Sequence, residues 1–171
     1  MAIDETERLK TLRDYLVMNT LPEEVFNDVV RLASGICETP IALISLVDDQ
    51  KQWFKARIGL DTAETPREQA FCAHAILYPS DVMEVSDATK DPRFRSNPLV
   101  TGDPNIRFYA GAPLVAPNGQ ALGTVCVIDR VPRKLDYRQF KLLSALARQV
   151  MAILEMQKRI RDLEAERQKM S

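Results

Sequence analysis

The sequence predicts an α+β fold built on one antiparallel sheet, and three observations support this prediction. Apolar residues at helical spacing occur at residues 5–16, after Pro22, and from residue 136 almost to the end of the chain. Two hairpin patterns, at 41–58 and 107–129, lie between these helical segments. Helices grouped at the ends and strands grouped in hairpins are typical of an antiparallel sheet covered by helices.

Composition and charge exclude several classes of function. The 171 residues are 46% apolar and 27% charged, which fits one globular domain. A net charge of −1 provides no single-sign field for nucleic acid or a membrane surface. The longest uncharged apolar run in the body, 41–47, is far shorter than the ~20 residues of a membrane span, and no secretion signal opens the chain. Three cysteines without paired spacing argue against disulfides and structural zinc and favour a reducing cytoplasm.

Two amphipathic helices are expected near the amino terminus. In the first, Leu9, Leu12 and Leu16 recur at three- and four-residue spacing and form one apolar stripe. The second begins near Pro22, has acidic residues in its first turn, and ends before Thr39-Pro40. Its expected apolar stripe consists of Val25, Val29, Leu32 and Ile36.

A hairpin and a loop-rich middle segment follow these helices. Residues 41–47 are uncharged and apolar except for Ser45, which is typical of a mostly buried strand, and 52–58 alternate in part. From 59 to 107 the periodicity fades, and only 71–77 and 82–85 are compact enough for a helical turn and a short strand. Long loop-rich segments inside compact domains are more often functional than idle, so we expect the site here.

A second hairpin and a long helix complete the chain. Asn118-Gly119 between two apolar runs is a strong hairpin signal, and Pro113 indicates an irregularity or an edge in the first strand. A helix from Asp136 to Lys169 would be roughly 50 Å long at about 1.5 Å per residue, whereas a body of this size is about 40 Å across. Part of that helix must therefore protrude.

Several motifs follow one another in a distinctive order: Thr39-Pro40 with the run 41–48, Trp53-Phe54, 71–76, Asp87-Ala88, 91–94, 108–114 and 122–129. This order resembles the GAF domain, especially the GAF modules of bacterial sensor histidine kinases and diguanylate cyclases. The resemblance implies a twisted antiparallel sheet of five or six strands, with the terminal helices on one face and a loop-covered pocket on the other. We therefore expect an amino-terminal helix in 1–20, a GAF domain in 21–153, and a signalling helix or coiled-coil extension in 154–171.

The resemblance implies a small-molecule pocket between the sheet and a cover formed by 71–76 and the loops 87–106. The residues expected to bind the ligand are Trp53, Phe71, Cys72, His74, Asp87, Phe94, Arg107 and Tyr109. Ligand sites are mostly apolar with a few orienting polar groups, and Arg107 could pair with an anionic group. Each residue also has a structural alternative: isolated aromatic residues usually belong to the core, loop aspartates often cap turns, and Arg107 could pair with a loop carboxylate.

A thiol-based redox enzyme or sensor acting through Cys72 is the competing function. Cys72 and His74 lie two residues apart, so on a helical turn they face different directions and do not form a nucleophilic dyad. The free methionine sulfoxide reductases are GAF proteins with several reactive cysteines, and Cys72 occupies a comparable region. No other cysteine lies between Ala73 and Val125 to resolve an oxidised Cys72, which argues against this activity.

The sequence assigns no cofactor. Bilin-binding GAF domains attach the chromophore through a cysteine shortly before the strand that here begins at Arg107, or through one in an Asp-x-Cys-Phe motif. Residues 96–106 contain no cysteine, and Asp91-Pro92-Arg93-Phe94 has arginine at the cysteine position, so a covalent bilin is not expected. Cyclic nucleotide binding stays open, because those pockets rely on dispersed contacts.

The last helix favours a homodimer. A heptad pattern runs through Leu143, Leu146, Val150, Ile153, Gln157 and Ile160, and the residues beyond Leu154 are mainly charged. Together with the first helix, the residues expected to contact the partner are Leu9, Leu12, Leu16, Leu146, Val150, Ile153 and Ile160. The alternative for the end of this helix is a frayed, solvated tail.

These features predict a non-catalytic, cytoplasmic sensory module. It would bind a small molecule and pass the signal through its terminal helices to a kinase or cyclase output domain, fused or separate. A purely structural dimerisation module with an empty pocket is the third reading.

Overall fold

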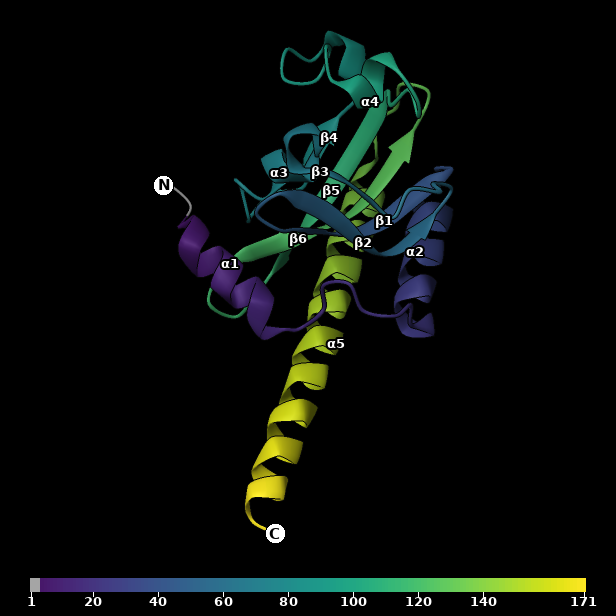
Figure 1. Cartoon of the computed structure of the whole chain (residues 1–171). Helices are drawn as coiled ribbons and strands as arrows, with labels where there is room; N and C mark the ends of the chain where they lie inside the picture. The colour runs from purple at the N-terminus through teal and green to yellow at the C-terminus, as the bar shows by residue number, and fades with distance from the viewer. Residues whose placement is uncertain (1–3) are drawn as a thin grey trace.

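The computed structural model describes residues 4–171, which form a six-stranded antiparallel sheet (Figure 1). The strands are β1 (Ile41–Val47), β2 (Lys51–Ile58), β3 (Glu64–Pro66), β4 (Met83–Val85), β5 (Phe108–Val115) and β6 (Ala121–Asp129). Their order across the sheet is β3-β2-β1-β6-β5-β4. The predicted α+β fold and both predicted hairpins are confirmed.

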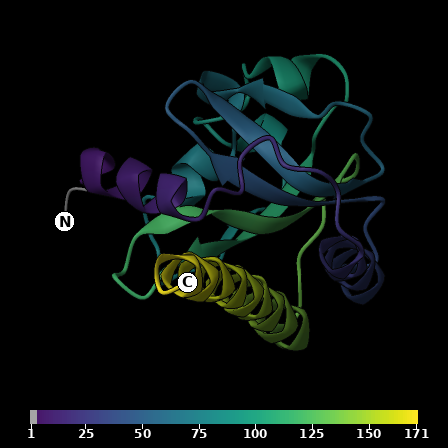
Figure 2. The ribbon, with the colours of Figure 1, turned by 60° about the horizontal axis from the view of Figure 1, so that its bottom comes forward.

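Three long helices and four short ones surround the sheet. The long helices are α1 (Glu5–Asp14), α2 (Glu24–Cys37) and α5 (Tyr137–Lys169). The short ones are η1 (Arg67–Gln69), α3 (Cys72–Ala75), η2 (Ala88–Lys90) and α4 (Pro98–Thr101). In Figure 2, α2 and α5 lie beneath the sheet and the short elements with their loops lie on its other side. No helix in residues 4–171 has the length and apolarity to cross a bilayer.

Each face of the sheet carries its own apolar cluster, and β1 contributes to both. Ile44 and Leu46 point to the helix-side cluster, whereas Ile41 and Leu43 point to the loop-side cluster. A strand that is buried on both faces carries apolar residues on both, and the one polar residue of β1, Ser45, is satisfied by hydrogen bonds. This explains why the run 41–47 shows no alternation.

Helix α1 packs into the domain, which corrects part of the expected dimer surface. Leu12 is fully buried in the helix-side cluster, so the prediction that it contacts a partner is wrong. Leu9 is half-buried, and the helix ends at Asp14, before Leu16. Leu16 has a φ of 53° and is 65% exposed, so it does not continue the helical stripe.

The buried face of α2 also differs from the expected stripe. Val29 is buried, but Val25 and Leu32 are exposed, and Ile36 is only partly buried. Phe26 and the other buried residues lie on a neighbouring face that contacts the sheet. Apolar residues occupy much of this helix, so spacing by itself did not show which face is covered.

Helix α5 begins with the capping box formed by Asp136 and Gln139 and packs on the sheet as far as Leu154. Val150 is fully buried within the chain, so the prediction that it contacts a partner is wrong. Leu146 and Ile153 pack partly against the same cluster. Beyond Leu154 the helix extends away from the sheet (Figure 1), as its length predicts.

Candidate functional site

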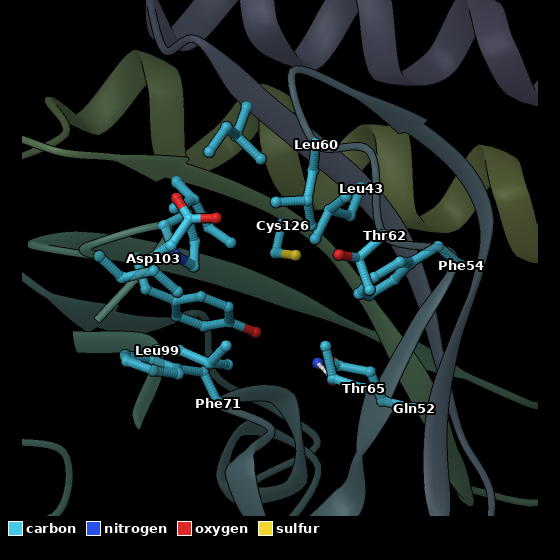
Figure 3. Close-up of a pocket in the computed structure, with 15 residues that line it drawn as sticks. Leu43, Gln52, Phe54, Leu60, Thr62, Thr65, Phe71, Leu99, Asp103 and Cys126 are labelled. Carbon is cyan, nitrogen blue, oxygen red and sulfur yellow. Dashed lines mark hydrogen bonds between the residues drawn. The ribbon is translucent and has the colours of Figure 1, made fainter. Parts of the chain in front are cut away.

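A cavity of about 80 Å³ lies on the loop side of the sheet. Figure 3 shows the 15 residues that line it. Strand residues form the floor: Ile41, Leu43, Gln52, Phe54, Thr65, Tyr109, Cys126 and Ile128. The remaining lining residues are Leu60, Thr62, Phe71, Leu99, Asp103, Pro104 and Ile106. Thr62 and Asp103 are exposed to solvent, which places the opening of the cavity near them.

A buried aromatic cluster forms one wall of the cavity. The rings of Phe71 and Phe94 stack with their centroids 4.0 Å apart, and Phe71 also contacts Tyr109 at 5.2 Å. His74 packs edge-on against Phe94 at 4.9 Å. Gly111 makes room for this arrangement, because a Cβ atom there would overlap the Tyr109 hydroxyl. Residues from the loop side and from strand β5 therefore meet in one packed aromatic cluster.

Buried polar side chains beside this wall satisfy one another. Ser45 donates to the Gln52 Oε1 at 2.7 Å, and Gln52 Nε2 donates to Thr65 Oγ1 at 2.6 Å. The Cys72 thiol contacts both Ser45 and Gln52. In residues 4–171 no buried side-chain nitrogen or oxygen lacks a hydrogen-bond partner. This network fixes the cavity floor and leaves its interior mostly apolar.

The pKa shifts of the cysteines and the histidine near the cavity favour their neutral forms. Burial raises the pKa of Cys72 to about 11, and burial also raises the pKa of Cys126. Burial lowers the pKa of His74, and the nearby Arg93 acts in the same direction. At neutral pH both thiols are therefore protonated and weakly nucleophilic. Among residues 4–171, no three His, Cys, Asp or Glu side chains gather as metal ligands would.

The structure brings five of the predicted site residues together. Phe71 and Tyr109 line the cavity. Phe94 and Cys72 pack directly behind the lining residues. His74 touches Phe94 and also borders a separate surface hollow outside the cavity.

Three other predicted site residues lie elsewhere, which corrects those expectations. Trp53 pairs with Leu46 on β1 and packs on the helix side of the sheet, opposite Tyr109. Asp87 caps η2 by accepting a hydrogen bond from the Thr89 amide. Arg107 donates to backbone carbonyls in the cover rather than to the cavity. Arg107 also forms none of the salt bridges found in residues 4–171, so the alternative prediction of a salt bridge to a loop carboxylate is wrong.

Sequence reasoning missed most of the polar lining. Gln52, Thr62, Thr65 and Asp103 all face the cavity, and none was expected there. Gln52 had a usable signal, because it shares a strand face with Phe54 and not with Trp53. Thr62 and Asp103 lie in loops and Thr65 lies in a three-residue strand, so no strand or helix spacing marked them in the sequence.

An ion pair and a hydrogen bond connect η1, α1 and α5. Arg67, four residues before Phe71, donates to the carboxylate of Glu5 at 2.5 Å. The same carboxylate accepts two hydrogen bonds from Arg8, at 2.9 and 3.0 Å, and Arg8 reaches the Ala121 carbonyl oxygen at the start of β6. At the other end of α1, the Tyr15 hydroxyl donates to Glu155 of α5. The short helix η1, α1 and α5 therefore form one connected set of contacts, and η1 ends just before the cavity-lining Phe71.

Comparison with known proteins identifies a family and a close relative. The family model described as GAF domain matches residues 21–154. A Pseudomonas aeruginosa protein named cyclic di-GMP phosphodiesterase PA2567 is 56% identical over 131 residues. The match covers 76% of this chain but 22% of that protein, so the chain spans about a fifth of this relative.

Solved structures share the fold at low sequence identity. The GAF domain of an Acinetobacter phosphoenolpyruvate-protein phosphotransferase has a TM-score of 0.65 at 15% identity, covering 91% of this chain and 95% of that one. A type II free methionine-R-sulfoxide reductase from Thermoplasma acidophilum has a TM-score of 0.63 at 13% identity, covering 78% and 92%. These two likenesses concern the fold alone. With the family model matching most of its length and the strands in the order described above, the chain belongs to the GAF domain family.

Proposed function

We propose that this chain is a non-catalytic sensory module of a cyclic di-GMP signalling protein. Its cavity binds a small molecule, and α1 and α5 transmit the occupancy to an output domain. The observation that carries the proposal is the ion pair between Arg67 of η1 and Glu5 of α1, because η1 ends just before Phe71, which lines the cavity. The output assignment rests on the 56% identity to the protein named as a cyclic di-GMP phosphodiesterase.

The connected contacts provide a physical route for the signal. A ligand that displaces Phe71 would also move η1, because that short helix ends at Gln69, close to Phe71 in the chain, and η1 contains Arg67. The Glu5 carboxylate then bridges η1 to α1, and Tyr15 and Asp14 at the end of α1 contact Glu155 and Arg161 of α5. The ligand can shift the equilibrium between two arrangements of α1 and α5 only by the difference between its binding free energies for the two arrangements.

The dimer part of the proposal uses a surface of α5 that differs from the expected one. Met156, Ile160 and Leu163 are 65%, 53% and 52% exposed, and they continue the partly buried Ile153 in steps of three, four and three. Such spacing is the heptad pattern of a coiled coil, and a single helix cannot cover it. We propose that this stripe packs against the same stripe of a second copy and, with residues 154–171, forms a coiled-coil extension of the GAF domain.

The dimer is tested by Ile160→Asp with Ala165→Asp as a matched control. Both residues are exposed on α5, but Ala165 lies on the opposite side of the helix from the stripe. Sedimentation at tens of micromolar should show that the first variant is monomeric and the second dimeric. A monomeric unmodified chain at that concentration, or equal behaviour of the two variants, would contradict the dimer.

The thiol-enzyme alternative gains no support from the site. Cys72 is buried, its pKa is raised to about 11, and its partners are Ser45 and Gln52 rather than a base. Nucleophilic and redox thiols are instead accessible and have a lowered pKa. The three free cysteines agree with the proposed cytoplasmic location.

Ligand binding is tested by following the melting temperature of the chain with a metabolite and nucleotide library. A ligand at 100 times its dissociation constant should add about 2.7 kcal/mol to the free energy of unfolding. Phe71→Leu should weaken the response, because Phe71 lines the cavity, whereas the exposed Leu77→Ala should not. A library without hits, or a hit that both variants bind equally, would count against the cavity as the sensor site.

A further inference from the structure

We propose that the cavity takes a small organic cation: a primary amine with a short apolar tail, its ammonium group held by Asp103. This inference rests on the proposed function, because it requires the cavity to be a ligand site. It specifies the charge and size of that ligand.

The charge of the lining points to a cation. Of the 15 lining residues, Asp103 carries the one charged side chain. Its carboxylate is exposed at the opening, across the cavity from Thr62 and Phe54 in Figure 3. Asp103 takes part in none of the ion pairs found among residues 4–171. The carboxylate is therefore available to a ligand.

Two arginines near this loop do not reverse that preference. Arg130 donates to the Pro104 carbonyl oxygen at 3.0 Å, and Arg107 donates to the carbonyl oxygens of Val100 and Ile106 at 2.9 and 3.0 Å. Neither arginine lines the cavity. An anionic ligand would therefore meet Asp103 and no cation of the lining, which disfavours phosphate and carboxylate ligands.

The exposed position of Asp103 keeps low the free-energy cost of removing water from the ammonium group of a bound ligand. A charge buried inside the cavity would lose its hydration, which is expensive even when it is paired. At the exposed opening, an ammonium group can pair with Asp103 and still contact water. The tail then occupies the interior, where removal of apolar surface from water is favourable.

The interior sets the size of the tail. Its walls between the opening and the floor are aliphatic and aromatic, including Leu43, Leu60 and Ile128. An apolar cavity of about 150 Å³ holds one benzene molecule with its six carbon atoms, so a cavity of about 80 Å³ suits roughly three carbon atoms, and a further carbon atom beside the ammonium group would lie at the opening. The polar floor groups Gln52 and Thr65 already bond to each other and so do not require a polar tail.

A matched series of butylamine, 1-butanol and butyrate tests the inference, because the three probes differ mainly in charge. At pH 7 the amine is fully protonated and butyrate fully ionised. Binding is followed by NMR shifts of cavity residues such as Phe71. We expect saturable binding of butylamine at least tenfold tighter than that of 1-butanol, and no binding of butyrate.

Two variants locate the effect. Asp103→Asn should bring the affinities for butylamine and 1-butanol within threefold of each other. Asp61→Asn removes an exposed carboxylate from the loop beside Leu60 and Thr62 and should leave the preference unchanged. Both positions are exposed, so both variants should fold, and their melting temperatures check this.

Each other outcome overturns the inference in a distinguishable way. If 1-butanol or butyrate binds as tightly as butylamine, or if the preference survives in Asp103→Asn, the cavity is a ligand site but not one for cations. If none of the probes shifts the cavity resonances, the cation inference is wrong. The library screen then decides separately whether the cavity binds ligands of another class.

Discussion

The Glu5 ion pairs should stabilise the whole domain, and Glu5→Gln measures how much. The carboxylate accepts hydrogen bonds from Arg8 and Arg67, and the Arg8 side chain is completely buried. Glutamine keeps the shape of the residue but removes its charge. The Arg8 guanidinium would then keep a longer hydrogen bond, 3.3 Å, to the Ala121 carbonyl oxygen.

The expected loss follows from the burial of the two partners. Removing one partner of a fully buried ion pair costs about 3–5 kcal/mol, because the other charge stays buried. The side chain of Glu5 is 40% exposed, so water compensates part of the loss, and we expect about 1.5–3 kcal/mol. For a domain of this length that corresponds to a decrease in Tm of roughly 3–12 °C.

Urea unfolding at several pH values tests this expectation, with Glu7→Gln on the exposed face of α1 as the control. Arg8 first, and Arg67 with it, lowers the pKa of Glu5 from 4.5 to about 2. A lowered pKa stabilises the folded state above pH 4.5, and this contribution is lost as the pH falls towards 2. The difference between the unmodified chain and Glu5→Gln should therefore shrink over that range. Equal stability of Glu5→Gln and Glu7→Gln at pH 7 would refute the reasoning. So would a stability difference between the unmodified chain and Glu5→Gln that does not change with pH.

The remaining predictions concern packing and thiol chemistry. Leu12→Ala should lower the free energy of unfolding by about 2–5 kcal/mol at every protein concentration. The control Leu16→Ala, at an exposed position, should change the free energy of unfolding by less than about 0.5 kcal/mol. A loss that depends on protein concentration would instead place Leu12 in a dimer interface. Cys72 should react with a thiol probe at pH 7.5 much more slowly than in urea, because it is buried and its pKa is about 11; rapid labelling of the folded chain would contradict this. Gly35→Ala should stabilise the chain by about 0.5–1 kcal/mol, because α2 has open space there. Gly123→Ala should disrupt the pairing of β6 with β1, because a Cβ would overlap a β1 carbonyl oxygen. Calorimetry should give Gly35→Ala the higher Tm of the two variants, and the opposite order would contradict both expectations.

The sequence by itself determined the elements whose signals are local. The apolar run 41–47 predicted a mostly buried strand, and it is β1 with the same bounds. Asn118-Gly119 specified the turn between β5 and β6, with Gly119 at a φ of 88°. Asp136 specified the start of α5 through its cap. Propensity, turn chemistry and capping act within a few residues, so one sequence contains all the information they need.

Tertiary structure decided which surface each side chain faces. Alternation in β2 separated Trp53 from Phe54, but the side of the sheet that each occupies depends on pairing with β1, which is apolar on both faces. Helical spacing in α5 likewise identified Val150 and Ile160 as apolar positions without showing that the domain covers the first and leaves the second exposed. Asp103 reaches the cavity through a loop whose path no periodicity encodes. Faces, cover and loop paths depend on contacts between distant segments, and those contacts exist only in the folded chain.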